Sequence, residues 1–241
     1  MQIYGKHLNV IRQLFSGSGT ICLVGGGGKS TVMYAIAQHR ARLGEKVLVG
    51  TTTHIFVPPQ CFAADKQQAE NLWIQKQPAV IGTITGEKLT ASPLLLSQLR
   101  AQADVTFLEA DGAKRYPCKV PAAWEPAIDP ACTLVAAVFG LSAIGKPLGQ
   151  VCFRSELAAQ LLDVTQSHIL VPLDAAKMLA SAYGGKRGVG SRGWCALLNQ
   201  CDDGLRRKYA EEVTQHLEEM GETNVVMTTF DEKERAQWSS I

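Results

Sequence analysis

The sequence lacks any long uncharged apolar run and any segment that resembles a leader peptide. No stretch of about 18 apolar residues, the length that spans a bilayer, occurs in the chain. The first 15 residues also lack the apolar centre of a signal peptide. We therefore expect a cytoplasmic protein that neither crosses a membrane nor binds to one.

Paired cysteines and an excess of one charge are also missing. The seven cysteines are scattered and form no C-x-x-C pair, which argues against a zinc site and against a disulfide framework. Lys and Arg number 24 against 22 Asp and Glu, a net charge of +2. This balance gives no indication of a nucleic-acid partner, and it does not reveal the oligomeric state.

The organisation of the chain indicates one domain over residues 1–241. We find no internal repeat, no low-complexity tract and no long linker rich in Pro, Gly or Ser. A hydrophobic content of 46% in 241 residues is enough for a substantial core.

Apolar runs and helical periods alternate along the chain. We expect strands over 20–24, 46–51, 79–84, 104–109, 133–139, 168–171, 194–199 and 224–227. Helical patterns cover 31–43, 64–76, 93–103, 155–162, 174–182 and 203–220. This alternation predicts an α/β fold with three layers, doubly wound and mainly parallel, similar to that of P-loop NTPases.

A glycine-rich loop lies between the first buried strand and the first helix. Its residues are Gly25, Gly26, Gly27, Gly28, Lys29, Ser30 and Thr31. In this context the backbone N–H groups and the helix dipole favour a polyphosphate, the lysine reaches the β and γ phosphates, and Ser30 is the natural Mg²⁺ ligand. Thr31 is expected at the α-phosphate or as a helix cap. The loop is shorter than G-x-x-x-x-G-K-[ST], because Leu23 occupies the position of the first glycine.

Three threonines, Thr51, Thr52 and Thr53, follow the second strand at the edge where open parallel sheets bind ligands. A threonine here could complete the Mg²⁺ shell or sense the γ-phosphate. Alternatively, the three β-branched residues simply continue the strand.

Two acids, Glu109 and Asp111, end the strand over 104–109. Residues two apart on an extended strand point to the same side, so both can serve one Mg²⁺ ion, or one can hold the metal while the other orients or deprotonates water. We therefore predict Lys29, Glu109 and Asp111 as catalytic residues and Ser30, Glu109 and Asp111 as metal ligands. A turn cap beside a solvated acid is the structural alternative.

A late motif, Asn199-Gln200-Cys201-Asp202, follows the strand over 194–199. GTPases with a P-loop carry N-K-x-D at this point of the chain, where Asp binds guanine and Asn braces the loop. Gln200 replaces the lysine, so Asn199 and Asp202 suggest base contacts without deciding between ATP and GTP. An ordinary turn after a strand is the alternative.

Several segments together resemble the YqeC family over nearly the whole chain. They are VGGGGKST, VGTTTHIFVP, FLEADGAKRYPCKVP, the stretch Gly145 to Leu148 and the Asn199/Asp202 pair. By this resemblance the chain is an accessory protein of selenium-dependent molybdenum hydroxylases. The resemblance implies a molybdenum hydroxylase client, or its molybdenum cofactor, as partner.

The residues and the resemblance lead to one hypothesis and two alternatives. The hypothesis is Mg²⁺-dependent binding and hydrolysis of ATP or GTP during maturation of the hydroxylase. One alternative is a ligase or kinase, because the short loop is similar to the ATP loop of Mur-type ligases. The other is a chaperone that holds nucleotide or cofactor without turnover.

Overall fold

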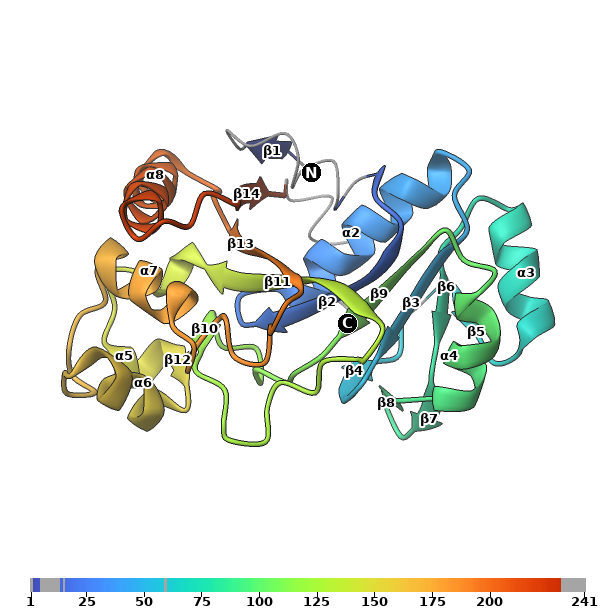
Figure 1. Cartoon of the computed structure of the whole chain (residues 1–241), viewed down its shortest axis with the longest axis horizontal. Coiled ribbons are helices and arrows are strands. Elements are labelled where there is room, and N and C mark those ends of the chain that lie inside the picture. The colour runs from blue at the N-terminus through green and yellow to red at the C-terminus, as the bar shows by residue number, and fades with distance from the viewer. Residues whose placement is uncertain (1, 5–13, 15, 59, 231–241) are drawn as a thin grey trace.

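The computed structural model describes residues 2–4, 14, 16–58 and 60–230 (Figure 1). Its centre is a nine-stranded sheet with the order β1-β14-β13-β11-β2-β9-β3-β6-β5. The strands are β1 (Gln2–Tyr4), β2 (Gly19–Gly25), β3 (Val47–Thr51), β5 (Phe62–Ala63), β6 (Ala79–Ile81), β9 (Val105–Glu109), β11 (Cys132–Gly140), β13 (Gly193–Asn199) and β14 (Val225–Thr229). Neighbouring strands are parallel except at the edge, where β1 pairs antiparallel with β14.

Helices cover both faces of this sheet. They are α2 (Lys29–Arg42), α3 (Lys66–Ile74), α4 (Pro93–Arg100), α5 (Leu148–Val151), α6 (Ser155–Leu162), α7 (Pro172–Ala180) and α8 (Gly204–Glu219), with a 3₁₀ turn over Leu141–Ala143. In β2, Ile21 and Leu23 pack with α2, whereas Cys22 and Val24 belong to the core on the opposite face, with α5 to α8. Helices α3 and α4 enclose a smaller cluster around Leu48. The structure confirms the three-layer α/β fold.

Two small sheets flank the main one. Strands β4 (His54–Phe56), β8 (Lys88–Thr90) and β7 (Thr83–Thr85) form an antiparallel sheet, and β10 (Cys118–Lys119) pairs with β12 (Cys152–Phe153). The expected strand over 79–84 is therefore divided into β6 and β7, because the chain leaves the main sheet at Gly82. A Cβ at Gly82 would lie 2.8 Å from the Thr90 carbonyl oxygen, so the approach of β8 requires glycine there.

The segment 168–171 is not a strand, contrary to the sequence prediction. It forms one isolated bridge between Ile169 and Pro147. Leu170 is buried in the core, whereas Ile169 and Val171 are exposed, and Pro172 immediately begins α7. The other predicted strands lie within two residues of observed ones. Among the described residues, no helix has both the length and the apolar character needed to cross a membrane.

The connections on the two sides of β2 diverge at its carboxyl end. From β2 the chain passes through α2 to β3, which lies on one side of β2 beyond β9. From β9 the chain continues to β11, which pairs with the other side of β2. Open parallel sheets bind ligands where successive connections diverge in this way. The glycine loop, Thr51 and Glu109 all lie at this edge.

Candidate functional site

The glycine loop follows β2 in a conformation that side chains rarely adopt. Gly25, Gly27 and Gly28 have φ values of 93°, 87° and 96°. A Cβ at Gly27 would lie 2.2 Å from the backbone nitrogen of Gly140, and one at Gly25 would lie 2.3 Å from the Val138 carbonyl oxygen. Both the positive φ and the close backbone therefore require glycine.

The loop is braced by hydrogen bonds before any ligand arrives. The N–H groups of Gly25, Gly26 and Gly27 donate to Asp111 Oδ2, the Val138 carbonyl and the Tyr116 carbonyl, each at 3.0 Å. Gly28, the N-cap of α2, is exposed, and no described side chain caps this end. The first N–H groups of a helix have no partner inside it, and they favour an anion. The amides that can meet a phosphate therefore begin at Gly28.

Lys29 is held beneath this loop with only 4% of its surface exposed. Its Nζ donates to the Gly25 carbonyl at 2.6 Å and lies 3.1 Å from Asp111 Oδ1 and 3.7 Å from Glu109 Oε1. Burial lowers the pKa of Lys29, but the two carboxylates raise it by more, so that the net pKa lies above its ordinary value. The ammonium group is thus a fixed positive charge at the loop.

Ser30 and Glu109 bring two oxygen ligands together. The Ser30 hydroxyl donates to Glu109 Oε2 at 2.7 Å, which joins the first turn of α2 to the end of β9. Burial raises the pKa of Glu109, and Lys29 and Ser30 offset only part of that rise. A hydroxyl and a carboxylate are hard oxygen donors, so this pair fits Mg²⁺. Thr31 lies half-buried in the same turn.

Asp111 has different partners, although it lies only two residues beyond Glu109. Besides the Gly25 amide and Lys29, it faces Lys119, whose Nζ lies 3.2 Å from Asp111 Oδ2. The Asp111 side chain is 2% exposed and that of Lys119 is fully buried. Two buried ammonium groups therefore share one carboxylate. Among the described residues, no group of three or more His, Cys, Asp or Glu side chains could hold a metal ion.

A chain of charges continues outward from Lys119. Its Nζ donates to Glu125 Oε2 at 2.8 Å and to the Gly112 carbonyl at 2.7 Å. Glu125 in turn accepts both terminal nitrogens of Arg154 at the start of α6. Burial raises the pKa of Glu125, but Arg154 and Lys119 lower it by more, and the net pKa falls below its usual value.

The threonine run does not simply continue β3. The Thr51 hydroxyl donates to the Glu109 carbonyl at 2.9 Å and accepts the Thr53 amide at 2.9 Å. The Thr52 hydroxyl donates to the Ala127 carbonyl at 2.6 Å. Thr51 and Thr52 thus tie the ends of neighbouring segments together, and half-buried Thr53 sits on the turn between them and β4.

In the late motif, Asn199 reaches the glycine loop. Its Nδ2 donates to the Gly27 carbonyl at 2.8 Å, and its Oδ1 accepts the Thr228 hydroxyl at 2.9 Å. A Cβ at Gly28 would lie 2.8 Å from the same Nδ2, which leaves no room for a larger residue. Asn199 therefore braces the loop.

Asp202 lies farther along the chain and contacts side chains of the protein itself. It accepts Arg206 Nη1 and the Thr229 hydroxyl, each at 3.0 Å. Gln200 has a left-handed backbone with φ 69°, and its Oε1 accepts the Ser142 amide at 3.3 Å. A contact between Asp202 and a nucleobase stays a prediction.

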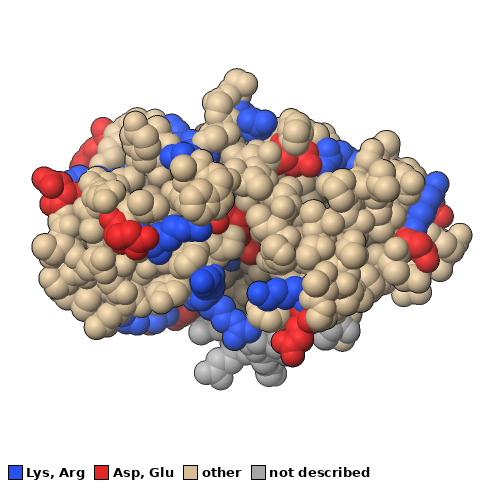
Figure 2. Space-filling model, turned by 90° about the horizontal axis from the view of Figure 1, so that it is seen from below, with Lys and Arg blue, Asp and Glu red and all other residues tan. Residues whose placement is uncertain are grey.

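Basic side chains gather on one face of the molecule. Figure 2 shows Lys and Arg gathered around a hollow near the middle of this face, with acidic side chains beside it. Lys114, Arg115 and Arg154 all have left-handed backbones, with φ values of 47°, 66° and 63°. Lys114 and Arg154 lie 5.3 Å and 4.6 Å from the centre of the Phe153 ring. Such backbone strain clusters at binding sites.

Sequence reasoning missed Glu125, Arg154 and the role of the Tyr116 carbonyl. Lys119 lies buried against Asp111. Glu125 and Arg154 lie 29 residues apart and meet only through the folding of the 119–125 segment against α6. No local pattern signals such a contact.

Two comparisons relate the chain to known proteins. The model of the family described as "YqeC protein" matches residues 21–156, which include the glycine loop, the threonine run, both acids and Arg154. The chain is 33% identical to "Uncharacterized protein YqeC" of Escherichia coli (strain K12) over 141 residues. This match covers 52% of the chain and 53%, about half, of the relative. Because the family model covers more than half of the sequence, the chain belongs to the YqeC family.

Proposed function

We propose that the protein binds a nucleoside triphosphate, ATP or GTP, together with Mg²⁺ at the carboxyl end of β2. The contact that carries this proposal is the 2.7 Å hydrogen bond from Ser30 to Glu109, directly beside buried Lys29. It joins the hydroxyl after the loop lysine to the acid at the end of a neighbouring parallel strand. Phosphate-binding loops likewise use a hydroxyl and a carboxylate, usually that of Asp, to hold their metal.

Each residue of the loop site has a proposed role. Gly25 to Gly28 shape the loop, the amides at the start of α2 meet phosphate oxygens, and Lys29 neutralises phosphate charge. Ser30 and Glu109 would hold Mg²⁺, which supplies charge neutralisation between the β and γ phosphates. The contacts of Asp111 with Lys29, Lys119 and the Gly25 amide favour a positioning role over metal ligation.

The biological role we propose is that of an accessory protein for a selenium-dependent molybdenum hydroxylase or its cofactor. The resemblance to the YqeC family supports this role. In this role, nucleotide hydrolysis or exchange would drive a conformational change during maturation of the hydroxylase or its cofactor. Phosphate release without any acceptor would support an NTPase, and binding without turnover beside the client would support a chaperone.

An acceptor-dependent ligase or kinase is the second candidate. The observation that favours it is the short loop, in which Gly25 and Gly28 are only three residues apart, as in Mur-type ligases. Product analysis separates the two: turnover of nucleotide only when an acceptor is added would select the ligase or kinase.

Lys29→Ala tests the proposal directly. We expect the Kd for the Mg²⁺ complexes of ATP and GTP to rise about 100-fold, or about 2.8 kcal/mol, because a buried charge at the phosphates is lost. Titration calorimetry with and without Mg²⁺ measures this change. Lys66→Ala, an exposed lysine on α3, is the matched control and should bind like the wild type.

Ser30→Ala keeps the test informative if Lys29→Ala does not fold. It removes one hydroxyl from a half-buried position and should abolish the dependence of nucleotide affinity on Mg²⁺. Unchanged affinity in Lys29→Ala, with the fold verified by circular dichroism, would defeat the proposal.

A further inference from the structure

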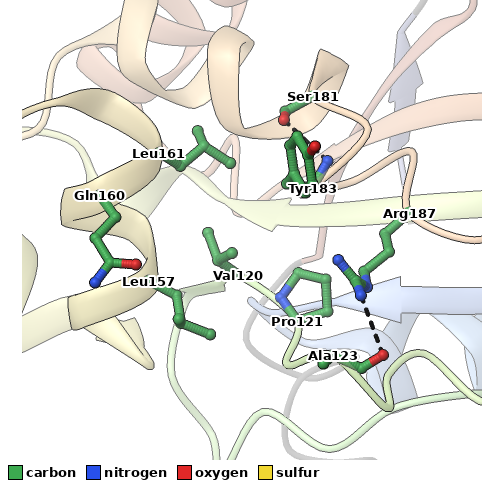
Figure 3. A pocket seen from close by; sticks show the side chains of 9 residues that line it. All are labelled: Val120, Pro121, Ala123, Leu157, Gln160, Leu161, Ser181, Tyr183 and Arg187. Atoms are coloured by element: carbon green, nitrogen blue, oxygen red, sulfur yellow. Dashed lines mark hydrogen bonds between the residues drawn. The ribbon is translucent and has the colours of Figure 1, made fainter.

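A cavity of about 540 Å³ lies beside the loop site, between the segment after β10 and helix α6 (Figure 3). Its volume falls within the range of about 300–1,000 Å³ that is usual for small-molecule sites. The residues that line it are Val120, Pro121, Ala123, Leu157, Gln160, Leu161, Ser181, Tyr183 and Arg187. Among the roles assigned above, none uses this cavity.

The walls of the cavity combine apolar side chains with exposed aromatic ones. In Figure 3, Leu157 and Leu161 of α6 lie on one side, with Pro121 and Arg187 opposite. Tyr183 lines the cavity and is 72% exposed, and Trp124, next to Ala123, is 78% exposed. Within the described residues these are the two exposed Phe, Tyr or Trp side chains. Exposed aromatics beside a cavity whose walls are partly apolar and partly polar mark a surface suited to a flat ligand.

Arg187 provides a positive charge at this cavity. Its Nε and Nη2 donate to the carbonyls of Glu125 and Ala123, each at 3.0 Å, which fixes the plane of the guanidinium. Within the part of the chain that the structure describes, no carboxylate forms an ion pair with Arg187, so its charge is not neutralised. A guanidinium held in this way favours a carboxylate, phosphate or similar anion.

The cavity and the loop site share one residue. The backbone carbonyl of Glu125 accepts Arg187 at the cavity, and its side chain accepts Lys119 and Arg154 on the other side. Lys119 in turn touches Asp111, and Val120 and Pro121 directly follow Lys119 into the cavity wall. A molecule in the cavity would therefore lie against the same segment that completes the loop site.

We propose that this cavity is a second ligand site, which takes a small, flat, partly apolar molecule with one anionic group. The apolar walls and Tyr183 would contact its body, and Arg187 would bind its charge. This inference does not depend on nucleotide binding, although the position of the cavity suits an acceptor or an effector of the chemistry at the loop.

The test uses 2-naphthoate as an anionic probe and 2-naphthalenemethanol as its neutral counterpart. We expect 2-naphthoate to bind the full chain saturably with a Kd below about 1 mM, and about tenfold more tightly than the alcohol. Calorimetry gives both constants. The indole N–H signal of Trp124, assigned with Trp124→Phe, should shift during the NMR titration because Trp124 directly follows Ala123, which lines the cavity.

Matched variants locate the site. Leu157→Trp, which fills the cavity, should reduce 2-naphthoate affinity about tenfold or more, whereas Leu94→Trp, at an exposed leucine on α4, should not. Arg187→Gln should remove the preference for the anion and leave the alcohol unaffected. Circular dichroism verifies that each variant folds.

Three outcomes would overturn the inference: no saturable binding, equal affinity for the two probes, or equal behaviour of Leu157→Trp and Leu94→Trp. Lys29→Ala separates it from the proposed function, because this variant should lose nucleotide and keep 2-naphthoate. Loss of 2-naphthoate in Lys29→Ala would place the probe at the phosphate loop and defeat the cavity proposal alone.

Discussion

The loop site and the neighbouring cavity differ in the burial and pairing of their charged side chains. At the loop, Lys29, Glu109, Asp111 and Lys119 are each less than 9% exposed, and they face one another. At the cavity, Arg187 bonds only carbonyls among the described residues, and Tyr183 is exposed to solvent. The first region is organised in advance by the fold, so changes there should cost stability. Changes in the second should cost ligand affinity and little stability.

The largest effect is expected from Gly27→Ala at the loop. The new Cβ would lie 2.2 Å from a backbone nitrogen, with φ at 87°, so we expect the free energy of unfolding to fall by about 4 kcal/mol or more. Urea denaturation measures the change. Gly44→Ala is the matched control, because Gly44 also has a positive φ, 95°, but a Cβ added there would have no atom within 4 Å. It should cost only about 1–2 kcal/mol, the strain alone. Equal losses would mean that packing around the loop is not rigid.

The next largest effect is expected from substitutions of Glu109 and Asp111, which should change stability and nucleotide binding in different ways. Asp111→Asn removes the carboxylate that two buried lysines share, and breaking such a buried ion pair costs about 3 kcal/mol of unfolding free energy. Glu109→Gln should cost less, because the raised pKa of Glu109 means that its ionised form is disfavoured by folding. Glu109→Gln should instead remove the effect of Mg²⁺ on nucleotide affinity. Denaturation and calorimetry on both variants check this contrast, and the opposite order of stabilities would refute it.

The smallest effect should appear at Glu125, the residue that joins the two regions. Its folded-state pKa is lowered by Arg154 and Lys119, so its stabilising contribution is present above the unfolded pKa of about 4.3 and is lost as pH falls through the folded value. Glu125→Gln should therefore lower the melting temperature at pH 7, with the difference from wild type shrinking below about pH 4. A difference that is independent of pH would show that the charge of Glu125 does not matter.

Local sequence patterns predicted the strands and helices that carry the loop site. They did not predict contacts between segments that are far apart in the sequence. The buried strand β2, the glycines after it and the acids after β9 are visible because apolar runs, turn residues and carboxylates occur in order along a short stretch. Thr51 was expected to face a ligand or to extend a strand, and it is the last residue of β3, but its hydroxyl bond to the end of β9 was not foreseen. Such a contact depends on which strand lies beside β3, and no local pattern contains that information.

The same reason explains the missed strands and the incorrect one. The sheet of β4, β8 and β7 consists of three-residue strands, too short for a periodic signal. The segment 168–171 has the composition of a strand but lacks a neighbour to pair with beyond a single bridge at Ile169. Ile169 and Val171 are exposed and Leu170 is buried, so the alternation typical of a strand is present, but the bridge to Pro147 does not extend into a ladder.

The bond from Asn199 to Gly27 connects positions 172 residues apart in the chain. A ribosome adds residues in order, so the nascent polypeptide exposes its four glycines long before β13 emerges to clamp them. Contacts of such large sequence separation form late and slow folding. The braced form of the loop should thus arise only after Asn199 has been synthesised, and a fragment that stops at residue 156 would carry the glycines without this bond.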